Sequence, residues 1–154
     1  MTTLGLSEMN GRRRQSLVAN PAACTGCLTC ETACSLTKTG HIFPEMARIH
    51  VDRDPFEGRF VPHICHQCSN PYCLSACSVD AIGISQRNGA VLIDREKCIG
   101  CKSCQRACPY GMIVFDEEGE KSFKCDLCGG NPQCIKVCPM HALGMAYFGG
   151  KVPL

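Results

Sequence analysis

The hydrophobic and polar positions of this 154-residue chain form short segments rather than long regular elements. Runs with the β-branched or alternating character of strands occur at Ser16–Ala19, Ala90–Asp94, Met112–Phe115 and Lys121–Lys124. Single helical turns are predicted at Glu31–Ser35, Leu74–Cys77, Gln105–Cys108 and Ile135–Cys138. Turn-forming residues at Gln86–Gly89 and Asp116–Gly119 predict two β-hairpins. The pattern predicts an α+β fold of two-stranded sheets and short helices.

A conventional hydrophobic core is hard to build from this composition. Trp is absent, Phe and Tyr total nine, and fifteen Gly and nine Pro interrupt the pattern. Pro109 and Pro139 close two of the predicted helical turns, because proline cannot continue a helix. Small folds with little apolar area to bury rely on metals or disulfides for stability. We therefore expect a bound metal group to form the core and the metal-free chain to be largely unfolded.

Sixteen cysteines fall into four groups of four, one group beside each predicted helical turn. The first and third sets share the spacing C-x2-C-x2-C-x3-C, and the second and fourth lengthen the middle gap to four and five residues. The sets are Cys24, Cys27, Cys30 and Cys34; Cys65, Cys68, Cys73 and Cys77; Cys98, Cys101, Cys104 and Cys108; and Cys125, Cys128, Cys134 and Cys138. Three thiolates on a tight loop and a fourth one turn later is the spacing that binds a 4Fe-4S cluster. The sequence predicts four such clusters.

Two other uses of these cysteines fit less well. Zinc sites use two C-x2-C pairs separated by a longer spacer, whereas here a third cysteine follows each pair within a few residues. Disulfides would account for the number of cysteines, but neighbours at C-x2-C spacing cannot join distant segments, and no secretory signal peptide is recognised. A zinc-stabilised binding module remains the alternative.

The intervals between the sets indicate how they pair. Twenty residues separate Cys77 from Cys98, as in bacterial ferredoxins that hold two clusters and exchange the fourth cysteine between them. This interval favours one module built from the second and third sets, inside another built from the first and fourth. The predicted fold is therefore two nested bacterial-ferredoxin-like modules around four 4Fe-4S clusters.

Four segments carry a family resemblance: CTGCLTCETAC, CHQCSNPYCLSACSVDAI, CIGCKSCQRACPYGMI and KCDLCGGNPQCIKVCPMHAL. They resemble the four-cluster, polyferredoxin-type iron–sulfur subunits of molybdopterin and tungstopterin oxidoreductases, over residues 15–148. Within that group the chain looks most like the small soluble electron-transfer subunit of tungsten aldehyde oxidoreductase.

The resemblance implies a nested set of cluster ligands. Cluster 1 would be held by Cys24, Cys27, Cys30 and Cys138, and cluster 2 by Cys65, Cys68, Cys73 and Cys108. Cluster 3 would be held by Cys98, Cys101, Cys104 and Cys77, and cluster 4 by Cys125, Cys128, Cys134 and Cys34. The corresponding divisions are an N-terminal arm (1–14), a discontinuous first module (15–61 plus 110–148), a second module (62–109) and a C-terminal tail (149–154).

Charge narrows the choice of partners. The formal charge is +2, but sixteen thiolates add −16 and four oxidised cluster cores about +8, which takes the loaded chain to about −6. Such a surface repels nucleic acid. The longest apolar runs, such as Ala142–Phe148, are too short to span a membrane. Arg12–Arg14 could begin a twin-arginine export signal, but such a signal needs a longer apolar stretch than Leu17–Ala19, which follows here. Free thiolates indicate a reducing compartment, so we expect a cytoplasmic protein.

Residues near the cysteines suggest secondary roles. Lys97, Lys102 and Arg106 surround the third set, which predicts the highest reduction potential for cluster 3. His63, His66 and His141 are expected at the surface or in hydrogen bonds, because sixteen cysteines already divide evenly among four clusters.

Two further features concern packing and partners. Gly26, Gly100, Gly129 and Gly130 lie in ligand loops, where they permit tight turns or close approach of backbone N–H groups to sulfur. The insertion 41–62, interrupted by Pro44, Pro55 and Gly58, is expected to be a docking loop for a catalytic subunit, with a packed cover as the alternative.

The predicted function is electron transfer without catalysis. The chain would relay electrons between a large tungsten- or molybdenum-pterin catalytic subunit and a flavin, NAD(P)H-type or other redox subunit. The alternatives are service to a carbon-monoxide dehydrogenase, formate dehydrogenase or hydrogenase complex, or a free-standing polyferredoxin. No Ser-His-Asp set, paired carboxylates or phosphate loop predicts an active site of its own.

Overall fold

The computed structural model describes residues 14–148. The predicted C-terminal tail and the N-terminal arm, except Arg14, lie outside the described residues. The elements in chain order are β1 (Arg14–Ala19), η1 (Pro21–Ala23), α1 (Thr29–Thr39), η2 (Pro44–Met46), β2 (His50–Asp54), β3 (Arg59–His63), α2 (Tyr72–Ser75), β4 (Ile82–Ile84), β5 (Val91–Ile93), α3 (Ser103–Ala107), β6 (Val114–Asp116), β7 (Lys121–Phe123), η3 (Leu127–Gly130), α4 (Gln133–Val137) and β8 (Leu143–Phe148). The strands form antiparallel pairs, β1–β8, β2–β3, β4–β5 and β6–β7, so the predicted α+β class is confirmed.

One helix follows each cysteine loop, as predicted, but the first is longer than one turn. Helix α1 continues past Cys34 to Thr39, where Ser35 permits a continuation that Pro109 and Pro139 prevent in the third and fourth sets. A serine alone does not extend the helix, because Ser78 follows Cys77 and α2 ends at Ser75. It ends at Gly40, whose φ of 79° gives a left-handed cap that favours glycine. Helices α3 and α4 instead end two residues before Pro109 and Pro139.

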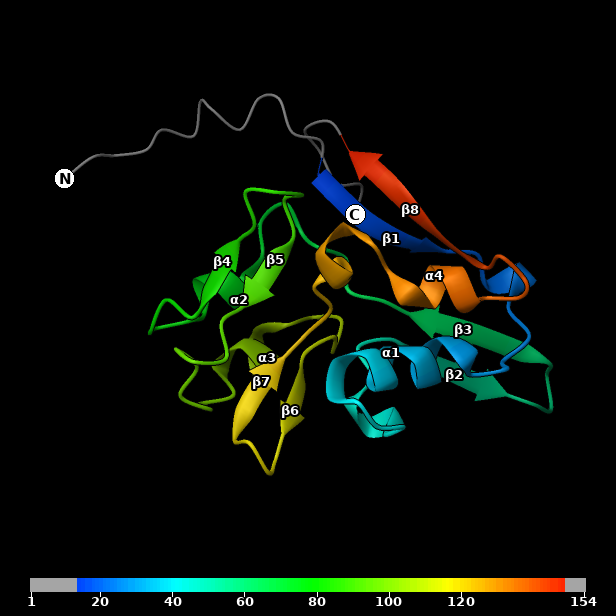
Figure 1. Cartoon of the computed structure of the whole chain (residues 1–154), viewed down its shortest axis with the longest axis horizontal. Helices are drawn as coiled ribbons and strands as arrows, with labels where there is room; N and C mark the ends of the chain where they lie inside the picture. Colours follow the sequence, from blue (N-terminus) through cyan, green and yellow to red (C-terminus); the bar gives the residue numbers. More distant parts are fainter. Residues whose placement is uncertain (1–13, 149–154) are drawn as a thin grey trace.

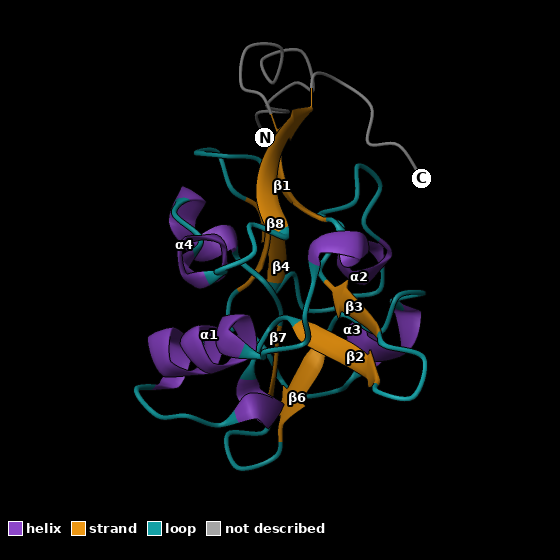
Figure 2. Cartoon of the chain, turned by 90° about the vertical axis from the view of Figure 1, so that its right-hand side faces the viewer, coloured by secondary structure: helices purple, strands orange, loops and turns teal. Residues whose placement is uncertain are grey.

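The two ends of the described chain meet in one sheet. Strand β1 pairs with β8 from Arg14 opposite Phe148 to Ala19 opposite Leu143. Helix α1 packs on α4, and the β1–β8 ribbon lies beside this helix pair (Figure 1, Figure 2). We call β1, α1, β2, β3, η3, α4 and β8 the outer lobe, because the chain enters it first and returns to it last.

The middle of the chain forms a second group, here called the inner lobe, made of α2, β4, β5, α3, β6 and β7 (Figure 1). The β4–β5 and β6–β7 hairpins turn where Gln86–Gly89 and Asp116–Gly119 predicted them. The β6–β7 hairpin contacts the loop of the third cysteine set: the Lys121 ammonium donates to the carbonyl oxygen of Cys98. The division based on sequence assigns this hairpin to the first module, whereas these contacts lie in the inner lobe.

The insertion 41–62 contains a β-hairpin that the sequence analysis did not anticipate. Strands β2 and β3 pair with Val51 opposite Pro62, and both side chains are buried. Their inner face covers the loop of the first cysteine set, while Phe43 and Phe56 are exposed. The hairpin is thus a packed cover on one side and open to solvent on the other.

Cysteines are part of both hydrophobic clusters. Cys30, Cys34 and Cys134 lie with Leu17, Ile49 and Leu127 in the outer lobe. Cys73 and Cys104 lie with Ile82, Val91 and Ile113 in the inner lobe. Within residues 14–148, no helix has the length and hydrophobicity needed to cross a bilayer.

Candidate iron–sulfur cluster sites

Site 1 is a cavity between the first cysteine loop and the end of the described chain. It is lined by Cys24, Cys27, Cys30 and Cys138. The remaining lining is almost entirely apolar and comes from Leu28, the β2–β3 hairpin and the segment leading into β8. The structure therefore brings together three cysteines of the first set and the last cysteine of the fourth.

Sites 2 and 3 share the inner lobe. Site 2 is lined by Cys65, Cys68, Cys73 and Cys108, and site 3 by Cys98, Cys101, Cys104 and Cys77. Each cavity takes three cysteines from one set and the last cysteine from the other.

Site 4 lies where α1 packs on α4. Cys34 and Cys134 are buried in the same hydrophobic cluster, with Cys125 packed against it. Burial raises the pKa of the Cys134 thiol most, and the charges of Cys125, Cys34, Cys128 and Cys30 raise it further, so these side chains lie within electrostatic range of Cys134. The fourth group of cysteines implied by the resemblance is thus also brought together, although Cys34 and Cys125 are far apart in sequence.

The last cysteine of every set accepts a hydrogen bond from a backbone N–H. For three of these cysteines the donor is the N–H of the residue four positions later: Ala81 donates to the Cys77 sulfur at 3.3 Å, Met112 to the Cys108 sulfur at 3.5 Å and Ala142 to the Cys138 sulfur at 3.3 Å. Cys34 instead receives the N–H of Arg48 at 3.2 Å, because α1 continues past it and no local turn supplies a donor. These donors fix the sulfur positions and favour the thiolate form.

The residue before the second cysteine of each set has a left-handed backbone. These residues are Gly26 (φ 69°), Gln67 (φ 47°), Gly100 (φ 73°) and Leu127 (φ 57°). The reversal lets successive sulfurs point into one cavity. Glycine is also required sterically in sites 1 and 3. A Cβ at Gly26 would overlap the Phe60 ring, and one at Gly100 would overlap the backbone oxygen of Glu120.

Two of the sixteen cysteines are exposed, Cys27 in site 1 and Cys101 in site 3. The Thr29 hydroxyl donates to the Cys27 sulfur at 3.3 Å and lowers the pKa of that thiol. The hydroxyl of Ser103 does the same for the pKa of Cys101. Sites 1 and 3 therefore share a glycine turn, a hydroxyl donor and an exposed sulfur.

Buried thiols show the opposite effect. Burial raises the pKa of Cys30 and Cys73 to about 11, and that of Cys125 and Cys134 to about 12. These groups are neutral thiols near neutral pH unless a positive centre binds them. A cationic iron–sulfur core supplies that charge, and its binding releases protons.

The arrangement of donors fits clusters better than single ions. Among residues 14–148, no three His, Cys, Asp or Glu side chains are placed to hold one metal ion. A zinc site brings its sulfurs within about 2.3 Å of one ion. In a cubane each thiolate binds a different iron, so the sulfurs stand farther apart. Four cysteines around an apolar cavity meet the second requirement.

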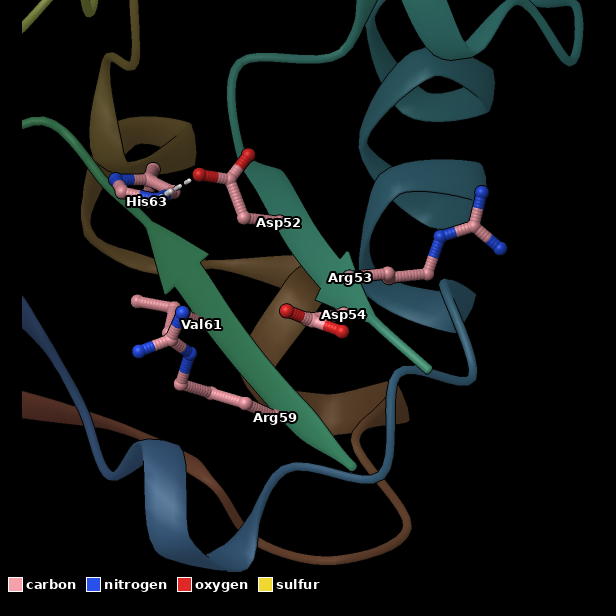
Figure 3. Close-up of a pocket in the computed structure, with 6 residues that line it drawn as sticks. All are labelled: Asp52, Arg53, Asp54, Arg59, Val61 and His63. Carbon is pink, nitrogen blue, oxygen red and sulfur yellow. Dashed lines mark hydrogen bonds and ion pairs between the residues drawn. The ribbon is translucent and has the colours of Figure 1, made fainter. Parts of the chain in front are cut away.

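The predicted histidines lie beside the cavities in other roles. His63 contacts the Asp52 carboxylate at 2.8 Å on the outward face of the β2–β3 hairpin (Figure 3). That face forms a polar surface pocket with no cysteine in its lining. His66 stacks on Tyr110 with ring centroids 3.9 Å apart, and His141 is exposed.

The basic residues near the third set are partly neutralised. Lys102 pairs with Glu117 at 3.1 Å, and Lys97 with Asp94 at 3.9 Å. Arg106 donates to the carbonyl oxygen of Cys101. The higher potential of cluster 3 stays a prediction.

Sequence reasoning missed two buried polar residues between the lobes, Gln67 and Lys124. Their side chains are 2% and 4% exposed. Each directly precedes a cysteine of a ligand loop, but a single polar residue in a loop gives no signal that distinguishes burial from exposure.

Comparison with known proteins identifies the chain as an iron–sulfur protein. A model of the 4Fe-4S dicluster domain matches residues 56–148, and one of a 4Fe-4S binding domain matches residues 21–40. The polyferredoxin-like subunit of aliphatic sulfonate oxidoreductase from Pyrococcus furiosus is 43% identical over 123 residues, covering 79% of this chain and 70% of that protein. The putative electron transport protein YsaA of Escherichia coli is 36% identical over 139 residues, covering 82% and 86%.

A solved structure supports the fold. The active site complex BamBC of benzoyl coenzyme A reductase contains a chain that matches with a TM-score of 0.55 and 24% identity, over 89% of this chain and 81% of that one. The chain is thus an iron–sulfur protein of the 4Fe-4S dicluster family, and it binds several 4Fe-4S clusters. Within that family it belongs with the polyferredoxin-like subunits of oxidoreductases.

Proposed function

We propose that this chain is a non-catalytic electron-transfer subunit that carries four 4Fe-4S clusters, one in each of sites 1 to 4. Each bound cluster takes up and gives up one electron. The observation that carries the proposal is the exchange of last cysteines: Cys138 lines the cavity of the first set, and Cys108 and Cys77 line each other's. Such an exchange is how two clusters are held side by side in ferredoxin modules.

The packing of the cysteines supports a linear order of the sites, 1–4–2–3. Cys30 of site 1 and Cys134 of site 4 share one hydrophobic cluster, as do Cys73 of site 2 and Cys104 of site 3. The link between the lobes runs from site 4 to site 2, where the charge of Cys65 raises the pKa of Cys125. The exposed Cys27 and Cys101 lie at opposite ends of this order. Electrons would enter at one end and leave at the other.

The proposed partners are a large tungsten- or molybdenum-pterin catalytic subunit at one end and a flavin subunit or other redox protein at the other. The similarity to a subunit of aliphatic sulfonate oxidoreductase supports service to an oxidoreductase. Phe43 and Phe56, beside and on the β2–β3 hairpin whose inner face covers site 1, are exposed and offer a docking surface for the catalytic subunit. Free thiolates are consistent with a reducing compartment such as the cytoplasm.

We also propose that the inner module extends through Phe123, because β6–β7 contacts site 3.

Metal analysis and a ligand substitution test the four sites. Anaerobically purified protein should be brown and contain about sixteen iron and sixteen sulfide per chain, whereas a colourless zinc protein would reject the proposal. Cys138→Ser should perturb the cluster of Cys24, Cys27 and Cys30. The nested ligation is wrong if it perturbs only the cluster of Cys125.

Magnetic coupling tests the order. Loss of cluster 1 in Cys24→Ala should reduce the electron-spin broadening of cluster 4, which keeps only its coupling to cluster 2, and leave the signal of cluster 3 unchanged. Broadening lost from cluster 3 would contradict the order.

The proposed partner is tested by purification at native expression, which should yield a complex with a much larger chain that contains tungsten or molybdenum. Isolation of the chain alone would favour a free-standing polyferredoxin.

A further inference from the structure

Lys124 lies between the two lobes with almost no exposed surface. Its ammonium faces three oxygens: Gln67 Oε1 at 3.4 Å, the carbonyl oxygen of Cys125 at 3.0 Å and the carbonyl oxygen of Val91. Oxygens of this kind can only accept hydrogen bonds. An ammonium has three N–H donors to match them, whereas a neutral amine would turn its lone pair towards one of them. The Lys124 ammonium therefore has an acceptor for each of its three donors.

This buried charge lacks a carboxylate partner. None of the ion pairs formed within residues 14–148 includes Lys124. An unpaired charge in a protein interior is strongly unfavourable, and three neutral carbonyl oxygens compensate only part of that cost. A negative group must therefore face it in the loaded protein.

The cluster sites are the negative groups within reach. Lys124 lines the cavity of site 2 together with Cys65, Cys68, Cys73 and Cys108, and it directly precedes Cys125 of site 4. Four thiolates around an oxidised cubane core leave a net charge of about −2, which grows to about −3 on reduction. A cation at this place favours the reduced state over the oxidised one.

We propose that Lys124 is the internal counter-ion of the two central cluster sites and raises the reduction potential of the cluster in site 2. The inference rests on the proposed electron-transfer function and deepens it. It assigns a positioning role to Gln67 as well. Gln67 Oε1 accepts the Val91 N–H at 2.8 Å beside the ammonium, and its Nε2 donates to the Cys125 carbonyl oxygen at 2.8 Å. This amide holds the cation where the lobes meet.

The other charged side chains near sites 2 and 4 do not take the place of Lys124 as a cation inside the cavity of site 2. Arg14 donates to the carbonyl oxygens of Cys68 and Gln67, at 2.8 and 3.4 Å, from the side of β1. Asp126 is paired with Lys38 at 2.7 Å and Arg48 at 3.1 Å beside site 4. Lys124 is the cation that lines the cavity of site 2.

The test is an EPR-monitored redox titration of the holoprotein with matched variants. Lys124→Met removes the charge at similar volume, Lys124→Arg keeps it, and Lys136→Met removes an exposed lysine of α4. In Lys124→Met, the ratio of reduced to oxidised cluster 2 at a fixed potential should fall at least tenfold, which is about 59 mV for one electron. Lys124→Arg should stay within twofold of the wild type, as should Lys136→Met. The signal of cluster 2 is assigned from its change in Cys73→Ser.

The outcomes separate this inference from the function on which it rests. A fully loaded Lys124→Met protein with an unchanged midpoint for cluster 2 overturns the counter-ion role and leaves electron transfer intact. If Lys124→Met fails to load cluster 2, loading itself becomes the measurement, and Lys124→Arg must restore it. An arginine variant that loads no better than the methionine variant overturns the inference and indicates a purely structural lysine. Absence of iron and sulfide from the wild-type chain would instead reject the proposed function.

Discussion

The hydroxyl of Thr29 lies 3.3 Å from the sulfur of Cys27, the exposed cysteine of site 1. Hydrogen bonds to ligand sulfur raise the potential of an iron–sulfur cluster, because they stabilise the more negative, reduced state. Thr29→Val keeps the shape of the side chain and removes the donor. We expect the midpoint of cluster 1 to fall by up to about 59 mV, a tenfold change in the reduced-to-oxidised ratio, measured by redox titration.

Thr37→Val is the matched control on the same helix, because the Thr37 hydroxyl donates to the carbonyl oxygen of Ala33 rather than to sulfur. Ser103→Ala should lower the midpoint of cluster 3 in the same way. Equal midpoints in Thr29→Val and the wild type would show that this hydroxyl does not tune the cluster.

Alanine at Gly26 or Gly100 should disrupt sites 1 and 3 for different reasons. Both positions have positive φ, but the added Cβ would meet a side chain, Phe60, in one case and the backbone oxygen of Glu120 in the other. Both variants should therefore lose about one cluster, or about four iron per chain. Phe60→Ala should restore loading to Gly26→Ala, whereas truncation of the Glu120 side chain should not rescue Gly100→Ala.

Gly40→Ala separates backbone strain from overlap, since Gly40 has a φ of 79° and open space around its α-carbon. It should cost about 1 kcal/mol of stability and keep all four clusters. A loss of iron in Gly40→Ala as large as in Gly100→Ala would contradict the steric explanation.

Asp126 should make stability depend on pH in the acid range. Its burial opposes ionisation, but the cations of Lys38 and Arg48 outweigh burial, and the net pKa lies below the ordinary value of 3.8. A carboxyl group with a lowered pKa stabilises the fold above its ordinary pKa, and this contribution disappears as the pH falls through the lowered value. Asp126→Asn should therefore be less stable than the wild type by about 1 kcal/mol at pH 7, with the gap closing below about pH 4.

Denaturant unfolding of the holoprotein, followed by circular dichroism under anaerobic conditions, measures that gap. Asp52→Asn is the control, because Asp52 is largely exposed on the β2–β3 hairpin. A gap for Asp126→Asn that stays constant from pH 7 to pH 3 would exclude the ion pairs as its source.

Removing iron should unfold both lobes. The buried cysteines form part of each hydrophobic cluster, so the metal-free chain has to pack empty cavities or neutral thiols in their place. Chelation under anaerobic conditions should abolish the far-ultraviolet circular dichroism of the fold, and iron with sulfide should restore it. A stripped chain that still unfolds cooperatively would show that the protein core does not depend on the clusters.

The sequence predicted the features that depend on local spacing. Cysteine spacing indicated the ligand loops. Turn residues at Gln86–Gly89 located the β4–β5 hairpin, and those at Asp116–Gly119 located the β6–β7 hairpin. The β2–β3 hairpin was missed because Pro62 lies within a strand and the charged residues Asp52 and Arg53 break the apolar pattern. The left-handed turns at Gln67 and Leu127 were missed because tertiary contacts, rather than glycine, hold them. Long-range packing likewise decides that Lys124 is buried.

The pairing of β1 with β8 has a consequence for how a cell makes this protein. A ribosome completes every proposed ligand of the inner pair of sites once Cys108 has emerged, whereas Cys34 must wait for Cys134, and Cys24, Cys27 and Cys30 must wait for Cys138. Cofactor insertion would then follow the order of translation, with the middle of the chain filled first. The earliest thiols to be synthesised would be the last to receive iron, and they would need protection from oxygen during that delay.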